Sequence, residues 1–164
     1  MTAPVNLSLG NNPINCDCHI YNFIRLLEKQ KTLLYQYLNL HDEHDVRCAQ
    51  PNLIFNTSLN FVVLGTLYCS VDCPENCFCR SRAVDQVIEV DCSNRSLDQP
   101  PSWLPKGNQI ELLLSRNNIK NVIGLSPLMN SYNITKLSLK ENQLENIDEL
   151  FIPDSIQVIM ITIS

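Results

Sequence analysis

The sequence predicts an α/β fold in which the repeats of a solenoid are interrupted by a disulfide-rich centre. Three observations lead to this prediction. A frame of spaced leucines and one asparagine recurs along the chain, eight cysteines lie between its copies, and an apolar stripe of helical spacing lies among those cysteines. The 164 residues suffice for one ordinary domain or two small ones, at about 100–150 residues per domain.

The frame L-x-L-x-x-N-x-L is filled twice in the C-terminal half of the chain. In QIELLLSRNNI it holds Leu112, Leu114, Asn117 and Ile119, and in ITKLSLKENQL it holds Leu137, Leu139, Asn142 and Leu144. The two asparagines are 25 positions apart, within the period of about 20–29 residues of leucine-rich repeats. Alternate leucines of a short strand point inward, and the asparagine can satisfy backbone groups of the turn that follows. One such stretch could be any half-buried strand, but two in register predict stacked leucine-rich repeats.

The same frame stands near both ends of the chain. VNLSLGNNPI fills it with Leu7, Leu9, Asn12 and Ile14, and SIQVIMITIS places Ile156, Ile159 and Ile161 where a third repeat would begin. The first residues have neither the basic nor the apolar region of a signal peptide, and the apolar tail 156–163 is far shorter than the roughly 18 residues of a membrane span. We therefore expect a piece of a longer secreted or membrane-anchored protein, which starts inside one array and ends inside another.

The cysteines indicate an oxidising compartment. Eight is an even number and several times the usual density in a cytosolic enzyme. Their short spacings are C-x-C and C-x3-C, whereas zinc sites usually draw two ligands from C-x2-C knuckles. In an extended C-x-C the two side chains point to opposite faces, so the two sulfurs seek different partners. Four N-x-S/T sequons also favour an extracellular glycoprotein: Asn6, Asn56, Asn94 and Asn133.

The segments between the repeats have their own patterns. Apolar residues recur at three- and four-residue steps across 19–40, which predicts an amphipathic helix or a pair of helices that could close the open end of the first array. Val84–Val90 is predicted to be a short strand leading into Cys92. Gln99–Pro105 contains three prolines and is predicted to be a rigid, non-helical loop.

Two cysteine-containing segments resemble known modules. N-P-I-N-C-D-C at 12–18, with Cys48 and Cys69 following, resembles the C-terminal flanking module that caps leucine-rich-repeat arrays. C-P-E-N-C-F-C at 73–79, followed by V-I-E-V-D-C-S-N-R-S-L and P-P-S-W-L-P, resembles the N-terminal flanking module that begins a new array. The resemblance implies a leucine-rich-repeat solenoid fragment with back-to-back disulfide-stapled C-terminal and N-terminal flanking caps. Its expected parts are the end of a first array at 1–14, a disulfide-rich helical C-terminal cap at 15–72, an N-terminal cap at 73–106 and the start of a second, truncated array at 107–164.

Such a junction resembles the part of insect Toll receptors just outside the membrane, and also Slit-type proteins. The segment HIYNFIRLLE after Cys18 lacks the tryptophans common in Slit-type caps, which favours Toll. Four cysteines alone allow three connectivities, so the pairing rests on the resemblance. It implies the disulfides Cys16–Cys48, Cys18–Cys69, Cys73–Cys79 and Cys77–Cys92.

The resemblance implies a non-enzymatic receptor piece on the extracellular side of the plasma membrane. It implies a Spätzle-type cystine-knot cytokine as the ligand of the whole receptor, in innate-immune or developmental signalling. For this piece we expect a receptor homodimer contact, and attachment to the membrane only through a transmembrane segment that the sequence lacks. The alternative is a secreted Slit-type guidance or matrix protein that binds another receptor. A net charge of −5 without long basic runs argues against nucleic acid or heparin as partner.

No catalytic, cofactor-binding or metal site is expected. His41 and His44 do not form an H-E-x-x-H motif, and the sequence around them is interpreted as a hydrated loop, with a metal hydrolase as the weakest alternative. There is no nucleophile-elbow motif and no phosphate-binding glycine loop among the four glycines.

A partner surface is expected on the concave side of the repeats, at residues between the inward leucines. The candidates are Ile110, Glu111, Leu113, Arg116, Lys136 and Lys140. Ile110 and Leu113 are apolar where solvent is expected. They are either covered by the neighbouring cap or part of a partner-binding patch.

Overall fold

The structure of this chain is a computed structural model that describes residues 5–29, 38–41 and 46–162. The chain divides into two compact units. Unit 1 contains Met1–Cys69 and Arg82–Val84, and unit 2 contains Ser70–Ser81 and Asp85–Ser164. The finer division into two array ends and two caps stays a prediction.

Unit 1 combines short parallel strand pairs with one helix. Strand β1 (Val5–Ser8) pairs with β3 (Leu38–His41), and β2 (Ile14–Asn15) pairs with β4 (Cys48–Gln50). The 3-10 segment η1 (Cys18–Ile20) leads into α1 (Tyr21–Lys29). Three more 3-10 segments follow β4, namely η3 (Asn52–Ile54), η4 (Leu59–Phe61) and η5 (Leu64–Thr66), and β5 (Tyr68–Ser70) comes after them. The core of the unit is formed by Cys16, Ile24, Val46, Cys48, Leu59, Val62 and Leu67.

The helix prediction for 19–40 is correct in part. Residues Tyr21–Lys29 are helical, and residues 30–37 lie outside the described chain. Leu38–His41 form a strand, so the helix prediction is wrong for its last three residues, 38–40. The physical reason is that a short apolar run fits a helix and a buried strand equally well. In the structure Leu40 stands opposite Leu7 of the first leucine frame.

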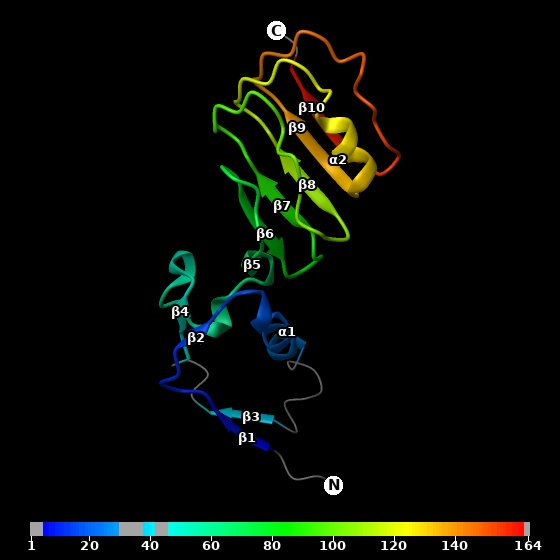
Figure 1. Cartoon of the computed structure of the whole chain (residues 1–164). Coiled ribbons are helices and arrows are strands. Elements are labelled where there is room, and N and C mark those ends of the chain that lie inside the picture. The colour runs from blue at the N-terminus through cyan, green and yellow to red at the C-terminus, as the bar shows by residue number, and fades with distance from the viewer. Residues whose placement is uncertain (1–4, 30–37, 42–45, 163–164) are drawn as a thin grey trace. The chain divides into compact units, whose positions relative to one another are not determined.

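Unit 2 is built on a sheet whose strands follow the chain order. The strands are β6 (Phe78–Arg82), β7 (Ile88–Asp91), β8 (Ile110–Leu113), β9 (Ile134–Leu139) and β10 (Val158–Ile161). The pair β6–β7 is antiparallel, and the following pairs are parallel. Figure 1 shows these strands side by side, with α2 (Leu125–Ser131) beside the sheet. The strand predicted at 84–90 begins only at Ile88.

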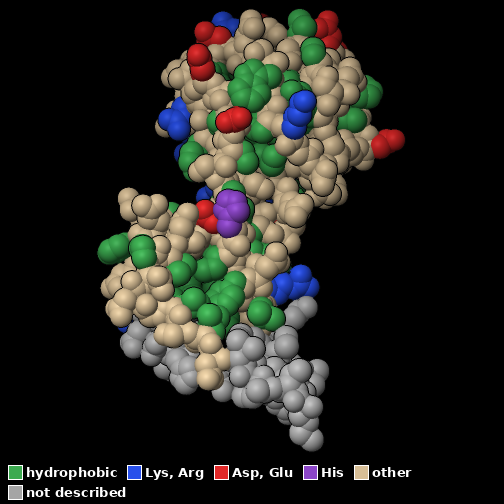
Figure 2. Space-filling model, turned by 60° about the horizontal axis from the view of Figure 1, so that its bottom comes forward, with side chains coloured by type: hydrophobic (Ala, Val, Ile, Leu, Met, Phe, Trp, Pro, Cys, Tyr) green, Lys and Arg blue, Asp and Glu red, His purple; other side chains and the backbone are tan. Residues whose placement is uncertain are grey.

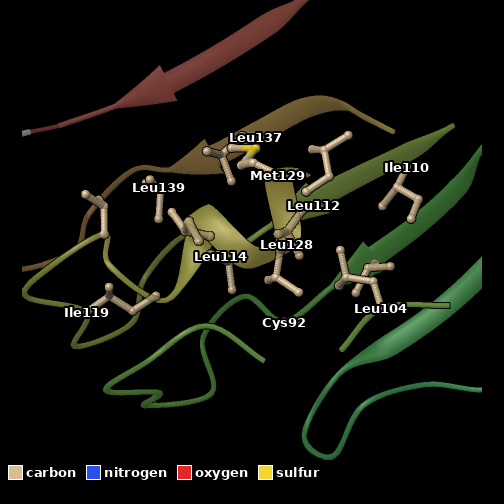
Figure 3. Packing of buried hydrophobic residues seen from close by; sticks show 14 of the residues in the cluster. Cys92, Leu104, Ile110, Leu112, Leu114, Ile119, Leu128, Met129, Leu137 and Leu139 are labelled. Atoms are coloured by element: carbon tan, nitrogen blue, oxygen red, sulfur yellow. The ribbon is translucent and has the colours of Figure 1, made fainter. Parts of the chain in front are cut away.

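The core of unit 2 lies between the sheet and α2. The strands bury alternate residues, such as Ile110 and Leu112 of β8, because successive side chains of a strand point to opposite faces. Leu128 and Met129 of α2 pack against this buried face together with Leu137 (Figure 3). These buried side chains confirm the leucine-rich-repeat solenoid predicted from the sequence.

Buried asparagines link the turns of the solenoid. Asn117 Oδ1 accepts hydrogen bonds from the backbone N–H groups of Arg95 and Leu97, both at 3.0 Å. Its Nδ2 donates to the carbonyls of Cys92 and Leu114, both at 2.9 Å. Each asparagine therefore satisfies its own turn and the turn before it, as backbone groups shielded from water require.

Asn142 repeats this arrangement one turn later. Its Oδ1 accepts from Ile119 N at 3.1 Å, and its Nδ2 donates to Leu114 O at 2.8 Å and to Leu139 O at 3.1 Å. The role predicted for the asparagine of the frame is confirmed in both full repeats.

The residue before the asparagine of the frame has a left-handed backbone. Asn11, Arg116 and Glu141 have φ of 60°, 58° and 54°, and Asn94 at the corresponding point of the preceding turn has 57°. Asparagine tolerates this conformation, but side chains such as those of Arg116 and Glu141 rarely adopt it. The stacked repeats therefore hold the turns at Arg116 and Glu141 in the left-handed conformation.

Candidate protein-binding surface

The outer face of the sheet in unit 2 carries two rows of side chains set by the strand register. The charged row runs across the strands as Arg80, Glu89, Glu111, Lys136 and Val158. The mixed row beside it runs as Phe78, Asp91, Leu113, Ser138 and Met160. We call these two rows together the outer sheet face.

The charges of the charged row are paired within the chain. Arg80 contacts Glu89 Oε1 through Nε at 2.8 Å and Nη2 at 2.7 Å. Lys136 Nζ lies 3.2 Å from Glu111 Oε2. All four side chains are partly buried, so these pairs are screened less than exposed pairs. The face therefore presents little unpaired charge to a partner.

The mixed row offers apolar surface between these charges. Phe78 is 54% exposed, and Leu113 and Met160 are partly exposed. Val158, at the end of the charged row, is 45% exposed. Aromatic and methionine side chains are enriched where proteins bind one another, so the outer sheet face has the composition of a protein-binding surface.

The structure separates the six predicted surface residues into three groups. Glu111, Leu113 and Lys136 lie on the outer sheet face. Arg116 and Lys140 are exposed in the turns that follow β8 and β9. Ile110 is 0% exposed, so the prediction that it faces a partner is wrong. It lies two residues before Leu112 and therefore points to the same buried side of the strand.

Sequence reasoning missed Phe78, Glu89 and Arg80 because they lie outside the repeat frame. It also missed the Glu111–Lys136 pair. These two residues are 25 positions apart, the same spacing as the two asparagines of the frame, and this signal would have identified the pair.

Arg116 and Glu141 form an exposed ion pair at one end of the strands. Arg116 Nε lies 3.0 Å from Glu141 Oε2, and both side chains are more than half exposed. Asn94 stands in the preceding turn, where its N–H donates to Ser115 O. At this end of the strands, Asn94, Arg116 and Glu141 therefore occupy corresponding positions of three consecutive turns.

The two sequons of unit 2 lie outside the rows of the outer sheet face. Asn94 and Asn133 are exposed in unit 2, outside both rows, and Asn133 Nδ2 donates to Asn108 O at 2.6 Å. Asn6 and Asn56 are exposed in unit 1. Neither Asn94 nor Asn133 belongs to the two rows, so glycans at these positions would not be attached to the outer sheet face itself.

Disulfides hold both units. Unit 1 contains Cys16–Cys48 and Cys18–Cys69, and unit 2 contains Cys73–Cys79 and Cys77–Cys92. In the chain-entropy model, closing loops of this size contributes about 2–4 kcal/mol per bridge. Small caps with limited cores depend strongly on such contributions.

Among the residues that the structure describes, one group has the spacing of metal ligands. Cys18, His19 and Cys69 place ligand atoms within 4.8 Å of one another, but the two cysteines are joined in a disulfide and are not thiolate ligands. His44 lies outside the described residues, and His41 contributes its backbone to β3.

A groove of about 640 Å³ in unit 2 is lined by Trp103, Lys106, Tyr132, Ser70, Val71, Asp72, Leu104 and Pro105. In the parts of the chain that the structure describes, no helix has the length and apolar character needed to cross a membrane.

Comparison with known proteins identifies the relatives of this chain. No family model matches it. Protein toll of Drosophila melanogaster is 29% identical over 156 residues, which cover 88% of this chain and 14% of toll. The chain is homologous to a segment of the Toll ectodomain. The sequence-based resemblance to Toll is thereby confirmed.

Solved structures agree with this relationship. A structure of the Toll–Spätzle complex, described as a hub in Drosophila development and innate immunity, matches 97% of this chain with a TM-score of 0.78 at 26% identity. Its glycosylated form matches 92% with a TM-score of 0.76 at 29% identity. The chain covers 22% and 21% of those chains, so it corresponds to about a fifth of the Toll chain that they contain.

Proposed function

We propose that this chain is an extracellular, non-enzymatic segment of a Toll-type signalling receptor. The observation that carries the proposal is the likeness to Toll in both sequence and structure, over most of this chain. The disulfides support an extracellular location, because such bonds persist in oxidising compartments. The Slit-type alternative has no comparable support among these findings.

The ligand of the whole receptor is then a Spätzle-type cystine-knot cytokine. The similar solved structures are complexes of Toll with Spatzle. Because this chain corresponds to only about a fifth of those Toll chains, we assign to it the contact between two receptors rather than the capture of the cytokine. This contact would bring two receptor chains together after the cytokine binds.

The outer sheet face is our candidate for this contact, and its occupant is a second copy of the chain. Charge supports the choice. Unit 2 contains seven basic and twelve acidic residues, so its net charge is −5, whereas unit 1 is neutral. Two copies of unit 2 repel over most of their surfaces. They repel least on the outer sheet face, where internal ion pairs neutralise four of five charges and Phe78, Leu113 and Met160 provide apolar area.

The test compares self-association of the intact chain with that of two variants. Leu113→Arg places a charge in the middle of the outer sheet face. Ile123→Arg makes the same change at an apolar residue that is 60% exposed elsewhere in unit 2, and serves as the matched control. Sedimentation equilibrium over a wide concentration range should show association of the natural chain and of Ile123→Arg, and about tenfold weaker association of Leu113→Arg.

Two results would overturn parts of this proposal. Equal association of both variants would remove the outer sheet face as the contact. Direct binding of a Spätzle-type cytokine to the chain, lost in Leu113→Arg only, would make this face a ligand site instead of a receptor contact.

A further inference from the structure

The four disulfides differ in how accessible their two ends are. Both cysteines of Cys16–Cys48 are buried. The two bonds of unit 2 each have one buried end, Cys79 and Cys92. Cys18 and Cys69 are the pair in which both ends are partly exposed.

This difference matters for thiol–disulfide exchange. An attacking thiolate needs access to one sulfur, and the other sulfur must leave as a thiolate. Burial disfavours a charged thiolate, so a bond with a buried end is a poor target even when its other end is reachable. Cys18–Cys69 avoids this cost at both ends.

A polar group stands beside one end of this bond. His19 Nδ1 lies 3.5 Å from Cys69 Sγ and 2.9 Å from Asp17 Oδ1. An ionised carboxylate only accepts hydrogen bonds, so Nδ1 carries the hydrogen in this contact. Asp17 is fixed in turn, because its Oδ2 accepts from Asn15 Nδ2 at 2.8 Å and its Oδ1 accepts from the backbone N–H of His19 at 2.8 Å.

The imidazole is thereby oriented, although it is open to solvent. Its side chain is 83% exposed. Figure 2, in which histidine side chains are purple, shows a histidine at the surface of the molecule. Asp17 is the N-cap of η1, the segment that contains both Cys18 and His19. The local structure of η1 therefore places an N–H donor next to the sulfur of Cys69.

We propose that Cys18–Cys69 is a site of thiol–disulfide exchange with a dithiol of the C-x-x-C oxidoreductase class. A thiolate of the dithiol attacks Cys18 Sγ, a mixed disulfide forms, and Cys69 leaves as a thiolate. This thiolate accepts the second branch of a bifurcated hydrogen bond from His19 Nδ1–H, whose first acceptor is Asp17 Oδ1. The second thiolate of the reductant then attacks the mixed disulfide and releases the Cys18 thiolate. The chain gains two electrons and the dithiol becomes a disulfide.

Opening Cys18–Cys69 would lower the stability of unit 1 but leave its other disulfide intact. Cys18 and Cys69 are 51 positions apart, so their bond closes a long loop from η1 to β5. Cys16–Cys48 stays closed within that loop and keeps β2 next to β4.

The first test maps which bonds open. The intact chain is treated with reduced thioredoxin, samples are quenched with N-ethylmaleimide over time, and labelled cysteines are identified by peptide mass spectrometry. We expect Cys18 and Cys69 to be labelled at least about tenfold faster than the other six cysteines, because access and leaving-group stability favour them. Simultaneous labelling of several pairs, or earlier opening of another pair, would contradict the proposal.

The direction of attack has its own readout. A thioredoxin variant without its second cysteine cannot resolve the mixed disulfide, so it stays bound to the sulfur that it attacked. We expect this adduct at Cys18. An adduct mainly at Cys69 would show that His19 does not assist the leaving sulfur.

The role of His19 is tested by His19→Ala, with Asn22→Ala on the exposed side of α1 as the matched control. We expect exchange at Cys18–Cys69 to slow about two- to fivefold in His19→Ala, the size expected for one solvent-exposed charge interaction. Labelling of Cys73 and Cys79 provides an internal reference. A purely structural role of His19 would accelerate exchange by loosening η1, so an unchanged or faster rate excludes the proposed assistance.

Discussion

Replacing Asn117 by alanine should destabilise unit 2 more than replacing any other asparagine of residues 107–164 by alanine. The side chain is 5% exposed, and its Oδ1 is the acceptor for the N–H groups of Arg95 and Leu97. A buried backbone group without its partner costs about 1–3 kcal/mol. Two such groups give about 2–6 kcal/mol, and water entering the partly buried turn brings our expectation to about 3 kcal/mol.

The assay is equilibrium unfolding in urea with the disulfides intact. With a slope of about 2 kcal/mol per molar urea, a loss of 3 kcal/mol lowers the midpoint by about 1.5 M. Asn118→Ala is the matched control, because the side chain of the neighbouring asparagine makes only longer hydrogen bonds, 3.4 Å to Ser96 O and 3.3 Å from Gln143 Nε2. We expect this control to stay within about 0.5 kcal/mol of the natural chain. Equal midpoints for the two variants would refute the assigned role of Asn117.

Three further predictions concern the same unit. Leu112→Ala should cost about 2–5 kcal/mol in urea unfolding, because the side chain is fully buried; a loss below 1 kcal/mol would mean that the core rearranges freely. Glu141→Asn should raise stability by about 0.5–1 kcal/mol in thermal unfolding, since asparagine tolerates the left-handed backbone that Asn94 already adopts; a lower melting temperature would contradict this reasoning. A double-mutant cycle with Glu111→Gln and Lys136→Gln should give a coupling of about 0.5–1 kcal/mol that falls with added salt, because the lysine is about one third exposed; a salt-independent coupling would argue against an ion pair.

The repeats were predictable because their sequence pattern has a direct physical cause. The leucines recur at every second position because a strand alternates its faces, and Asn117 and Asn142 are required because the turns bury polar backbone groups. The alternation acts within one strand, and the asparagine recurs at the same position of each repeat, so a short stretch of sequence shows the pattern.

The errors lie in short stretches of sequence. Such stretches contain too few residues to decide which side of a strand a residue faces, or whether the stretch forms a strand or a helix. Ile110 was placed on the concave side, either covered by the neighbouring cap or in contact with a partner, but it points to the same side of the strand as Leu112 and is buried in the core of unit 2. Residues 38–40 were assigned to a helix, but they belong to β3, which pairs with β1. In both cases neighbouring chain segments decided the outcome, and the local sequence fitted two alternatives.

The candidate site depends on contacts between distant segments, which explains why less of it was predicted. The Arg80–Glu89 pair follows from the register of β6 with β7. His19 lies beside Cys69 through the disulfide of Cys18, and the spacing of the cysteines left several pairings open. The resemblance to a known module supplied that pairing, and the structure adds the geometry around it.

The asparagines that link the turns also give the solenoid a direction during synthesis on the ribosome. Asn117 reaches back to Arg95, 22 residues earlier in the chain, and Asn142 reaches back 23 residues to Ile119. A newly made turn therefore keeps open backbone donors until the next turn has been translated, which takes about 1–5 s at about 5–20 residues per second. During each of these intervals the nascent chain ends in an unfinished turn, and this is when a chaperone or a neighbouring nascent chain has access to it.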